Sequence, residues 1–246
     1  MPINIILYGG GGLAVETARY IQEINESESG SKLVVTDLID DKKGRVDDLS
    51  TILGYTIDVH STLATIEGIN EKRIVLALGH SPIRDEKFQQ LKKSNYRFKT
   101  LIHPSAQVSN TAKLGEGCII APFVLIGAFA SIGDNVVVNI RSTIGHDANL
   151  GASCILSPHV VIGGSASCGR SVFFGAGAII NPGVKLGQFS KLSSGCIATS
   201  DVGPGNLVHG NPAIGRRIFN SDTGHSIFAR APAIQTPYHT KVSNKS

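Results

Sequence analysis

Two adjacent residues near the middle of this 246-residue chain, His146 and Asp147, could do acid–base chemistry. An imidazole titrates near neutrality and can accept a proton from an attacking amine or hydroxyl. A neighbouring carboxylate can fix the tautomer of the ring and stabilise the imidazolium that forms. The pair is therefore a candidate general base with its orienting acid. A solvent-exposed turn histidine is the alternative interpretation.

A glycine-rich turn near the N-terminus could bind phosphate. The apolar run 3–8 is followed by four glycines at 9–12, and then by apolar residues at helical spacing. A strand, a glycine turn and a helix N-terminus can receive phosphate through backbone N–H groups, although a tight turn without a ligand has the same pattern. The next expected strand, 33–39, ends in Asp40-Asp41, where a ribose hydroxyl or a base edge can be held. A solvated loop carboxylate is the alternative for these two residues.

The elements that would position this turn form a small α/β domain. We expect further strands at 55–57, 73–78 and 97–102, and a helix from Ser81 to about Ser94. This order indicates a parallel sheet, and ligands of such domains lie beyond the carboxyl ends of the strands. The residues expected to meet at that edge are Gly10, Gly11, Gly12, Asp40, Asp41, Gly79 and His80.

The element that would position His146 is a six-residue repeat. From Val108 to Ala198 every sixth residue is apolar, with no break in register, and the residue that follows is often Gly. Neither the helical nor the strand period gives this spacing, whereas hexapeptide repeats are the signature of a parallel β-helix. Three units make one triangular coil, with Gly where the chain turns or approaches closely. His146 and His159 then fall in turns and point outward, and Asn139 is either a substrate hydrogen-bonding residue or a turn former.

Charge and cysteine content narrow the class of protein. The net charge is +4, and residues 204–246 alone hold five Lys or Arg against one Asp. The excess positive charge therefore lies in this C-terminal part and does not indicate a basic, nucleic-acid-binding face on the rest of the protein. The four cysteines fit interior positions of the repeat and show no metal or disulfide spacing. We see no signal peptide and no membrane-spanning apolar run. We therefore expect a cytoplasmic protein without membrane insertion and without a metal.

Several motifs together carry a resemblance to a known family. They are residues 8–12, Ile39-Asp40-Asp41, Leu78-Gly79, residues 101–106, the run from Asn139 to Asp147, and residues 210–213. With them, about residues 3–217 resemble the bacterial sugar O-acyltransferase family. That family includes sialic acid O-acetyltransferases and the N-acetyltransferases of UDP-4-amino sugars in the bacillosamine pathway. The resemblance implies a left-handed β-helix, a homotrimer, acetyl-CoA in the groove between neighbouring prisms, and a nucleotide-sugar, with UDP favoured, on the N-terminal domain.

The resemblance also implies roles for single residues. His146 matches the general base and Asp147 its acidic partner. The implied substrate contacts are Gly10, Gly11, Gly12, Leu13, Asp40, Asp41, Gly79, His80 and Asn139, and the implied acetyl-CoA contacts are Ile155, Gly164, Ala176 and Ser194. Two positions depart from the family: Leu13 stands where members often have His, and Ile155 stands where some have a second His near the thioester.

These observations predict an α/β Rossmann-like domain (residues 1–104), a left-handed parallel β-helix (residues 105–217) and a C-terminal tail (residues 218–246) that is extended or mobile. The predicted activity is acetyl-CoA-dependent N-acetylation of a nucleotide-linked 4-amino sugar, for bacterial surface glycan biosynthesis. O-acetylation of sialic acid or a related sugar is the alternative. A zinc hydrolyase resembling the γ-class carbonic anhydrases needs three converging His, and the repeat offers two. A protein that only senses a nucleotide-sugar is a further alternative.

Overall fold

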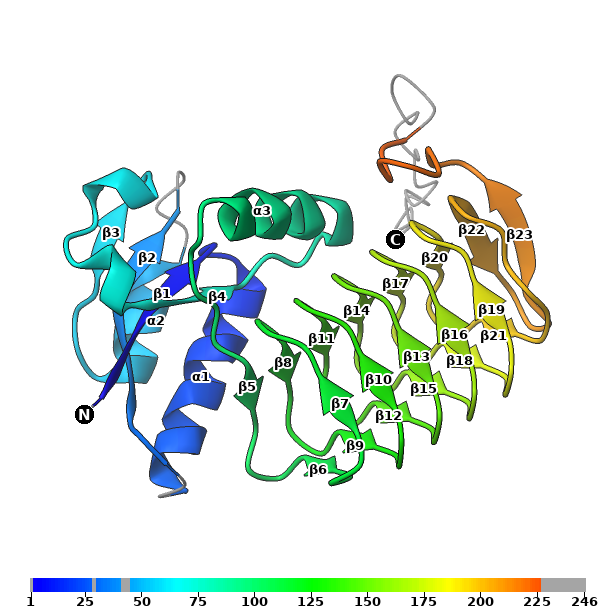
Figure 1. Ribbon diagram of the computed structural model, residues 1–246, viewed down its shortest axis with the longest axis horizontal. Coiled ribbons are helices and arrows are strands. Elements are labelled where there is room, and N and C mark those ends of the chain that lie inside the picture. Colours follow the sequence, from blue (N-terminus) through cyan, green and yellow to red (C-terminus); the bar gives the residue numbers. More distant parts are fainter. Residues whose placement is uncertain (1, 28–29, 41–44, 227–246) are drawn as a thin grey trace, which may run out of the picture.

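The computed structural model describes residues 2–27, 30–40 and 45–226. Two units lie side by side in Figure 1: a sheet with helices, and a stack of short strands that extends away from it. Asp41 and residues 227–246 lie outside the described residues, so the expectations for Asp41 and for most of the tail are not addressed by the structure.

The first unit is a four-stranded parallel sheet with the strand order β3-β2-β1-β4. Its strands are β1 (Ile3–Tyr8), β2 (Leu33–Ile39), β3 (Asp58–His60) and β4 (Arg73–Leu76). Ile5, Ile6 and Leu7 of the central strand are fully buried, as expected where helices or loops cover both faces of a parallel sheet. The parallel α/β prediction is confirmed. The third strand begins at Asp58 instead of residue 55. The Tyr55 hydroxyl accepts a hydrogen bond from the Val35 N–H of β2, at 3.1 Å.

In the described part of this unit, three α-helices and two short 3-10 helices accompany the sheet. They are α1 (Gly12–Glu26), α2 (Val46–Leu53), α3 (Ser81–Lys93) and the 3-10 turns Leu63–Thr65 and Ile69–Glu71. The helix α2 was not predicted, because it is short and buries a single residue, Leu49. Among the described residues, no helix is long and apolar enough to cross a membrane.

The second unit is a parallel β-helix with three faces, as the repeat predicted, and it is left-handed, as the resemblance implied. The covered face, against which α3 packs, contains β5 (Leu101–Ile102), β8 (Ile119–Ile120), β11 (Val137–Val138), β14 (Ile155–Leu156), β17 (Phe173–Phe174), β20 (Lys191–Leu192), β22 (Asn206–His209) and β23 (Ile214–Arg217). The apolar face contains β6 (Gln107–Val108), β9 (Leu125–Ile126), β12 (Thr143–Ile144), β15 (Val161–Ile162), β18 (Ile179–Ile180) and β21 (Ile197–Ala198). The polar face contains β7 (Lys113–Leu114), β10 (Ser131–Ile132), β13 (Asn149–Leu150), β16 (Ser167–Cys168) and β19 (Lys185–Leu186).

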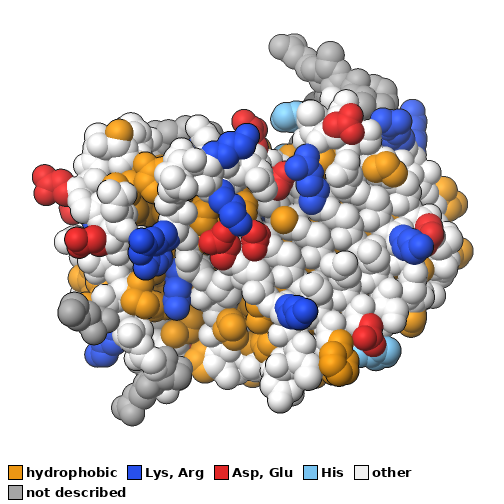
Figure 2. Space-filling view, viewed as in Figure 1, with side chains coloured by type: hydrophobic (Ala, Val, Ile, Leu, Met, Phe, Trp, Pro, Cys, Tyr) orange, Lys and Arg blue, Asp and Glu red, His pale blue; other side chains and the backbone are white. Residues whose placement is uncertain are grey.

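Apart from the antiparallel pair β22–β23, neighbouring strands on each face of the β-helix pair in parallel, one coil apart along the chain. Thr143 pairs with Val161, for example, so three hexapeptides separate stacked residues. The second residue of most strands points inward and is buried, as Ile144 is. In Figures 1 and 2 the polar face is turned to the viewer and carries few charged or hydrophobic side chains.

The repeated glycines allow the backbones of neighbouring coils to approach each other closely. A Cβ on Gly145 would lie 2.6 Å from the backbone nitrogen of Gly164 in the next coil, and one on Gly127 would lie 2.8 Å from the nitrogen of His146. Real Cβ atoms essentially never come so close to backbone. The left-handed conformation of most turns is carried instead by the second turn residue, such as Asp147 with φ 56° and His159 with φ 62°.

The two units join more closely than the sequence predicted. Residues 97–102 do not form a last strand of the α/β sheet. Phe98 makes an isolated bridge to Ile74, and β5 pairs with β8 in the β-helix. The reason is register, because Leu101 and Ile102 lie one coil before Ile119 and Ile120 and stack on them. One continuous hydrophobic cluster runs from α1 and the sheet into the β-helix interior.

Residues 218–226, the described part of the predicted tail, are held on the β-helix. The N–H groups of Ile218 and Phe219 donate to the carbonyl of Gly205, at 3.2 and 3.0 Å. Arg170 Nη2 donates to the carbonyl of Asp222 at 3.0 Å, and Gln188 Nε2 donates to that of Ser221 at 2.8 Å. The expectation of an extended or mobile tail is therefore wrong for this segment.

Candidate active site

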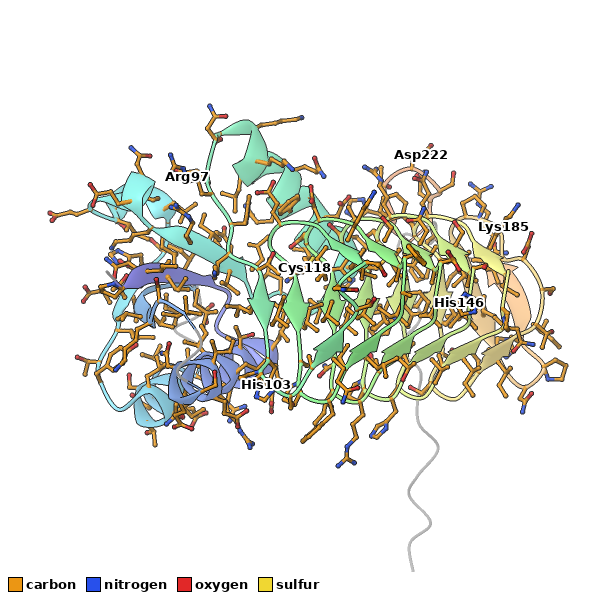
Figure 3. All side chains as sticks on the ribbon, turned by 60° about the horizontal axis from the view of Figure 1, so that its bottom comes forward. Arg97, His103, Cys118, His146, Lys185 and Asp222 are labelled. Atoms are coloured by element: carbon orange, nitrogen blue, oxygen red, sulfur yellow. The ribbon has the colours of Figure 1, made fainter. Side chains whose placement is uncertain are left out.

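His146 and Asp147 form a hydrogen-bonded pair in the turn between the apolar face and the polar face. His146 Nδ1 lies 2.8 Å from Asp147 Oδ2, and the two side chains are 69% and 55% exposed. The backbone fixes the turn, because Asp147 N–H donates to Ala128 O at 2.9 Å and Ser165 N–H donates to His146 O at 2.8 Å. Figure 3 shows His146 on the β-helix, far from the junction with α1.

This geometry defines which nitrogen of His146 is available. A carboxylate only accepts hydrogen bonds, so the contact with Asp147 places the proton on Nδ1 and leaves the lone pair of Nε2 exposed. The ring lies over Gly164 of the next coil, where a Cβ would be 2.7 Å from Nε2. The backbone N–H of Gly164 donates to no group in the described part of the chain. An exposed base and a free N–H donor therefore stand next to each other.

The other predicted β-helix residues lie elsewhere on the prism. Asn139, Ala176 and Ser194 follow strands of the covered face, in the turns that lead to the apolar face. They therefore lie along the opposite edge of the apolar face from His146 and Gly164. The side-chain oxygen Oδ1 of Asn139 accepts a hydrogen bond from the N–H of Ile140 at 2.8 Å. This bond within the turn fits the interpretation of Asn139 as a turn former.

Ile155 lies on neither of these edges. It is in β14 on the covered face and is 5% exposed. His159 stands in a turn on the same edge as Asn139, across the apolar face from His146. In the part of the chain that the structure covers, no group of three or more His, Cys, Asp or Glu is arranged to hold a metal ion.

The glycine turn, Asp40 and the end of β4 come together at the carboxyl edge of the parallel sheet. A Cβ on Gly10 would lie 2.1 Å from Asp40 Oδ2, and one on Gly9 would lie 2.9 Å from the side chain of Leu78. Gly9 also has a φ of 105°, a conformation that glycine adopts without strain. These close approaches explain the glycines at the first two positions of the turn.

The rest of the turn faces open space at the start of α1. A Cβ on Gly11 or Gly12 would meet nothing within 4 Å. Gly11 is the N-cap of α1 and makes no side-chain cap bond, and the first turn of α1 has no acidic residue. The partial positive charge of this helix end is therefore available to an anion. Leu13, the next residue, is partly buried and packs against the core.

Gly79 and His80 extend from this edge toward the β-helix. They line a pocket between the start of α3 and the coils that contain β17 and β20. Burial lowers the pKa of His80, and the positive charges of Lys191 and His225 lower it further. The sequence reasoning missed the β-helix side of this pocket. The only signal was Ser190, a hydroxyl in an interior position that the repeat usually fills with Ala, Cys or Val.

Comparison with known proteins supports the interpretation of this site. No protein-family model matches the chain. A GDP-perosamine N-acetyltransferase from Caulobacter crescentus, solved as a histidine-to-alanine variant with CoA and GDP-perosamine, is similar over 87% of this chain and 96% of its own, with 27% identity and a TM-score of 0.76. The acetyltransferase domain of PglB from Neisseria gonorrhoeae, solved with acetyl coenzyme A, matches over 88% of this chain and 100% of its own, with 24% identity and a TM-score of 0.76. WeeI from Acinetobacter baumannii matches over 88% and 100%, with 22% identity and a TM-score of 0.74.

The similarity to PglB and to WeeI shows the fold alone. The similarity to the GDP-perosamine N-acetyltransferase also indicates the class of protein, an acyltransferase. The neighbour with 27% identity is named as a sugar N-acetyltransferase and the PglB domain as an acetyltransferase, which is consistent with the predicted resemblance. The prediction of an acyltransferase fold, with an α/β unit before the β-helix, is confirmed.

Proposed function

We propose that this chain is an acetyl-CoA-dependent N-acetyltransferase that acetylates the amino group of a nucleotide-linked 4-amino sugar. The observation that carries the proposal is the His146–Asp147 pair, in which a carboxylate holds Nδ1 and leaves Nε2 exposed. The likeness to an enzyme named for N-acetylation of GDP-perosamine supports the acceptor class.

The proposed chemistry uses His146 as the general base. The sugar amine attacks the thioester carbonyl carbon of acetyl-CoA, and Nε2 of His146 takes the proton that the amine loses as the C–N bond forms. Asp147 orients the ring and stabilises the imidazolium. The N–H of Gly164, which donates to no group among the described residues, is the proposed donor to the oxyanion. The intermediate then collapses, the C–S bond breaks, and the CoA thiolate leaves and is protonated.

The nucleotide-sugar is proposed to bind at the carboxyl edge of the α/β sheet. Gly10, Gly11 and Gly12 offer backbone to its phosphates at the start of α1, and Asp40 stands beside them to hold the nucleoside. Asp41, Leu13, Gly79, His80 and Asn139 remain proposed contacts from the resemblance. Although UDP was favoured from the sequence, the neighbouring enzyme acts on a GDP-sugar, so both nucleotides belong in the test.

A homotrimer is proposed because one face of the prism is apolar and exposed. Leu125 and Val161 project outward from this face and are 42% and 39% exposed, and Phe123 and Phe129 stand at its edges. Apolar area of this kind marks an interaction surface. If the apolar faces of copies pack together, the edge with His146 and Gly164 approaches the edge with Asn139 on a neighbouring copy.

The groove between two such edges is the proposed site of acetyl-CoA. Gly164 would contribute from one copy, and Ala176 and Ser194 from the next, which explains why these residues lie on opposite edges of a single prism. Ile155 is nearly buried on the covered face, away from both edges of this groove, so the proposed site does not include it. The Gly164 N–H, which lies on an edge of the groove and donates to no group among the described residues, is proposed as the donor to the acetyl carbonyl.

The experiment that tests the function is acetyl-CoA turnover, followed by free-thiol release. The acceptors are UDP-, GDP- and dTDP-linked 4-amino sugars and free sialic acid. Turnover with one amino sugar nucleotide supports the proposal and identifies the nucleotide. Turnover with sialic acid alone would replace N-acetylation by O-acetylation, and no turnover with any acceptor would contradict both.

Gly164→Ala is expected to lower kcat by about tenfold while leaving the fold stable. The added Cβ would lie 2.7 Å from Nε2 and 2.9 Å from Cε1 of His146, so the ring must move away from its position over the coil. Steady-state kinetics and the urea midpoint of unfolding measure the two effects. The matched control is Gly203→Ala, whose Cβ would meet Asn206 at an ordinary 3.5 Å. An unchanged kcat in Gly164→Ala would show that the ring position is not important.

Val161→Asp is expected to dissociate the proposed trimer. A carboxylate at the centre of the apolar face would lose its hydration on assembly, at a cost of several kcal/mol. Sedimentation equilibrium measures the molecular mass, and turnover should fall as the trimer dissociates. Ser131→Asp, at the corresponding outward position of the polar face, should stay assembled. A trimer that survives Val161→Asp would place the interface on another surface.

A further inference from the structure

Apart from Gly79 and His80, which are proposed contacts of the nucleotide-sugar, the residues of the pocket at the start of α3 have no role in the proposed reaction. Its volume is about 220 Å³. It is formed by three parts of the chain, the turn from β4 to α3, the β-helix coils around β17 and β20, and the segment 218–226. Its lining residues are Gly79, His80, Ser81, Pro82, Ser171, Phe173, Phe189, Ser190, Lys191, Phe219 and Gly224.

Two hydroxyl groups at this pocket have no hydrogen-bond partner. Ser171 and Ser190 are each 1% exposed, and within the described residues neither Oγ contacts a donor or an acceptor. Other buried serines of the β-helix are satisfied: Ser142 Oγ donates to Ser157 O at 3.1 Å, and Ser153 Oγ accepts from Asn135 Nδ2 at 2.9 Å. A buried polar group without a hydrogen-bond partner destabilises the fold by about 1–3 kcal/mol. Two such hydroxyl groups at one pocket therefore indicate that a bound ligand supplies the missing hydrogen bonds.

The charges around the pocket favour an anion. The helix α3 is 13 residues long, and its N-cap, His80, makes no side-chain cap bond. Its first turn has no acidic residue, so the positive end of the helix dipole is unopposed. Lys191 adds a full positive charge, with Nζ 5.1 Å from the centre of the Phe173 ring. The nearest acidic side chain on α3, Asp85, does not line the pocket and has Arg170 at 3.8 Å.

The walls strengthen this preference. Phe173, Phe189 and Phe219 line the pocket together with the polar residues. Electrostatic attraction is stronger where the local dielectric constant is low. A helix N-terminus, two hydroxyl donors and an ammonium group in such surroundings match the oxygens of a phosphoryl group.

We propose that this pocket is a second phosphoryl-binding site, distinct from the glycine turn, that holds a phosphate of one of the two substrates. The inference rests on the proposed function for the identity of those substrates, a nucleotide-sugar and CoA, which both carry phosphate. Ser171 and Ser190 donate to the phosphoryl oxygens, the start of α3 supplies backbone N–H groups, and Lys191 neutralises the charge. Gly79 connects the pocket to the nucleotide edge, so the nucleotide-sugar is the nearer source: one of its two phosphates would lie at the glycine turn and the other in this pocket.

Isothermal titration calorimetry of the full chain with inorganic phosphate, GDP, UDP and CoA tests the proposal. Lys191→Met is expected to weaken phosphate binding about tenfold, and Ser190→Ala about fivefold, because each removes one hydrogen bond to a charged group. Lys185→Met is the matched control, because Lys185 and Lys191 both open Lys-Leu strands, but Lys185 is on the polar face. It should bind as the unmodified chain does.

The source of the phosphate is identified by the ligand whose binding affinity falls in the pocket variants. A loss confined to GDP or UDP assigns the site to the nucleotide-sugar, and a loss confined to CoA assigns it to the coenzyme. No binding of phosphate to the unmodified chain, or equal binding in both pocket variants, would overturn the proposal. Calorimetry needs no turnover, so this result is independent of whether the proposed reaction occurs. Circular dichroism and the urea midpoint show that each variant is folded.

Discussion

His146→Asn is expected to lower kcat for acetyl transfer by about 10²–10⁴-fold, the range for loss of a general base. Asparagine keeps the size of the side chain but cannot take a proton from the attacking amine. The KM values should change little, because Nε2 is exposed and its proposed role begins only as the C–N bond forms. Steady-state kinetics with the best acceptor of the nucleotide-sugar panel measure both values.

Asp147→Asn separates orientation from proton transfer. Asn tolerates the left-handed conformation of this residue, with its φ of 56°, so the backbone of the turn is kept. The amide can present a donor to Nδ1 and stabilise the wrong tautomer, so kcat should again fall. His209→Asn, an exposed histidine on β22, is the control and should retain full activity. Equal kcat values in His146→Asn and the unmodified chain would remove His146 from the mechanism.

Arg84→Ala is expected to lower the free energy of unfolding by about 3–5 kcal/mol. Arg84 is fully buried, and burial lowers the pKa of its guanidinium to about 9. Nε donates to Asn135 O at 2.8 Å and Nη2 to Gly117 O at 3.3 Å, and Nη1 donates to Leu76 O. One side chain thus joins the end of β4 to two coils of the β-helix. Removing it leaves three buried carbonyl groups without this donor and a cavity.

Urea unfolding followed by circular dichroism measures this change. The control is Arg19→Ala, which removes an arginine that is 65% exposed and paired with Glu23 on α1. Surface pairs of this kind contribute less than about 1 kcal/mol. If Arg84→Ala were as stable as Arg19→Ala, the three carbonyl contacts would not hold the two units together.

The β-helix could be predicted from the sequence because its period is strict. Each inward residue, such as Ile144 or Ile162, stacks on its equivalent one coil away, so a single register determines three sheets. The same register places Leu101 and Ile102 in the first coil, which the sequence reasoning assigned to the α/β sheet. In sequence, residues 97–102 look like one more strand of the α/β unit. Their stacking on Ile119 and Ile120 depends on residues 18 positions later in the chain and was therefore missed.

The site was only partly accessible from the sequence. His146 and Asp147 are adjacent, so their pairing follows from chemistry alone. Ser171, Ser190 and Lys191 form one pocket with His80 because α3 folds back over the covered face. That docking depends on the buried contacts of Arg84, which have no local signature in the chain. Residues brought together by docking of two units are therefore the ones that sequence reasoning misses.

The hairpin at the end of the β-helix has a consequence for solubility. A stack of parallel strands ends in a row of unpaired backbone groups, which is a template for edge-to-edge aggregation. Here β22 adds to β20, and the antiparallel β23 becomes the last strand of the covered face. All four residues of β23 are exposed, and Arg216 and Arg217 place two positive charges on it. A second molecule that paired with this edge would bring like charges together, so the strand reversal and its arginines limit the growth of the stack to one chain.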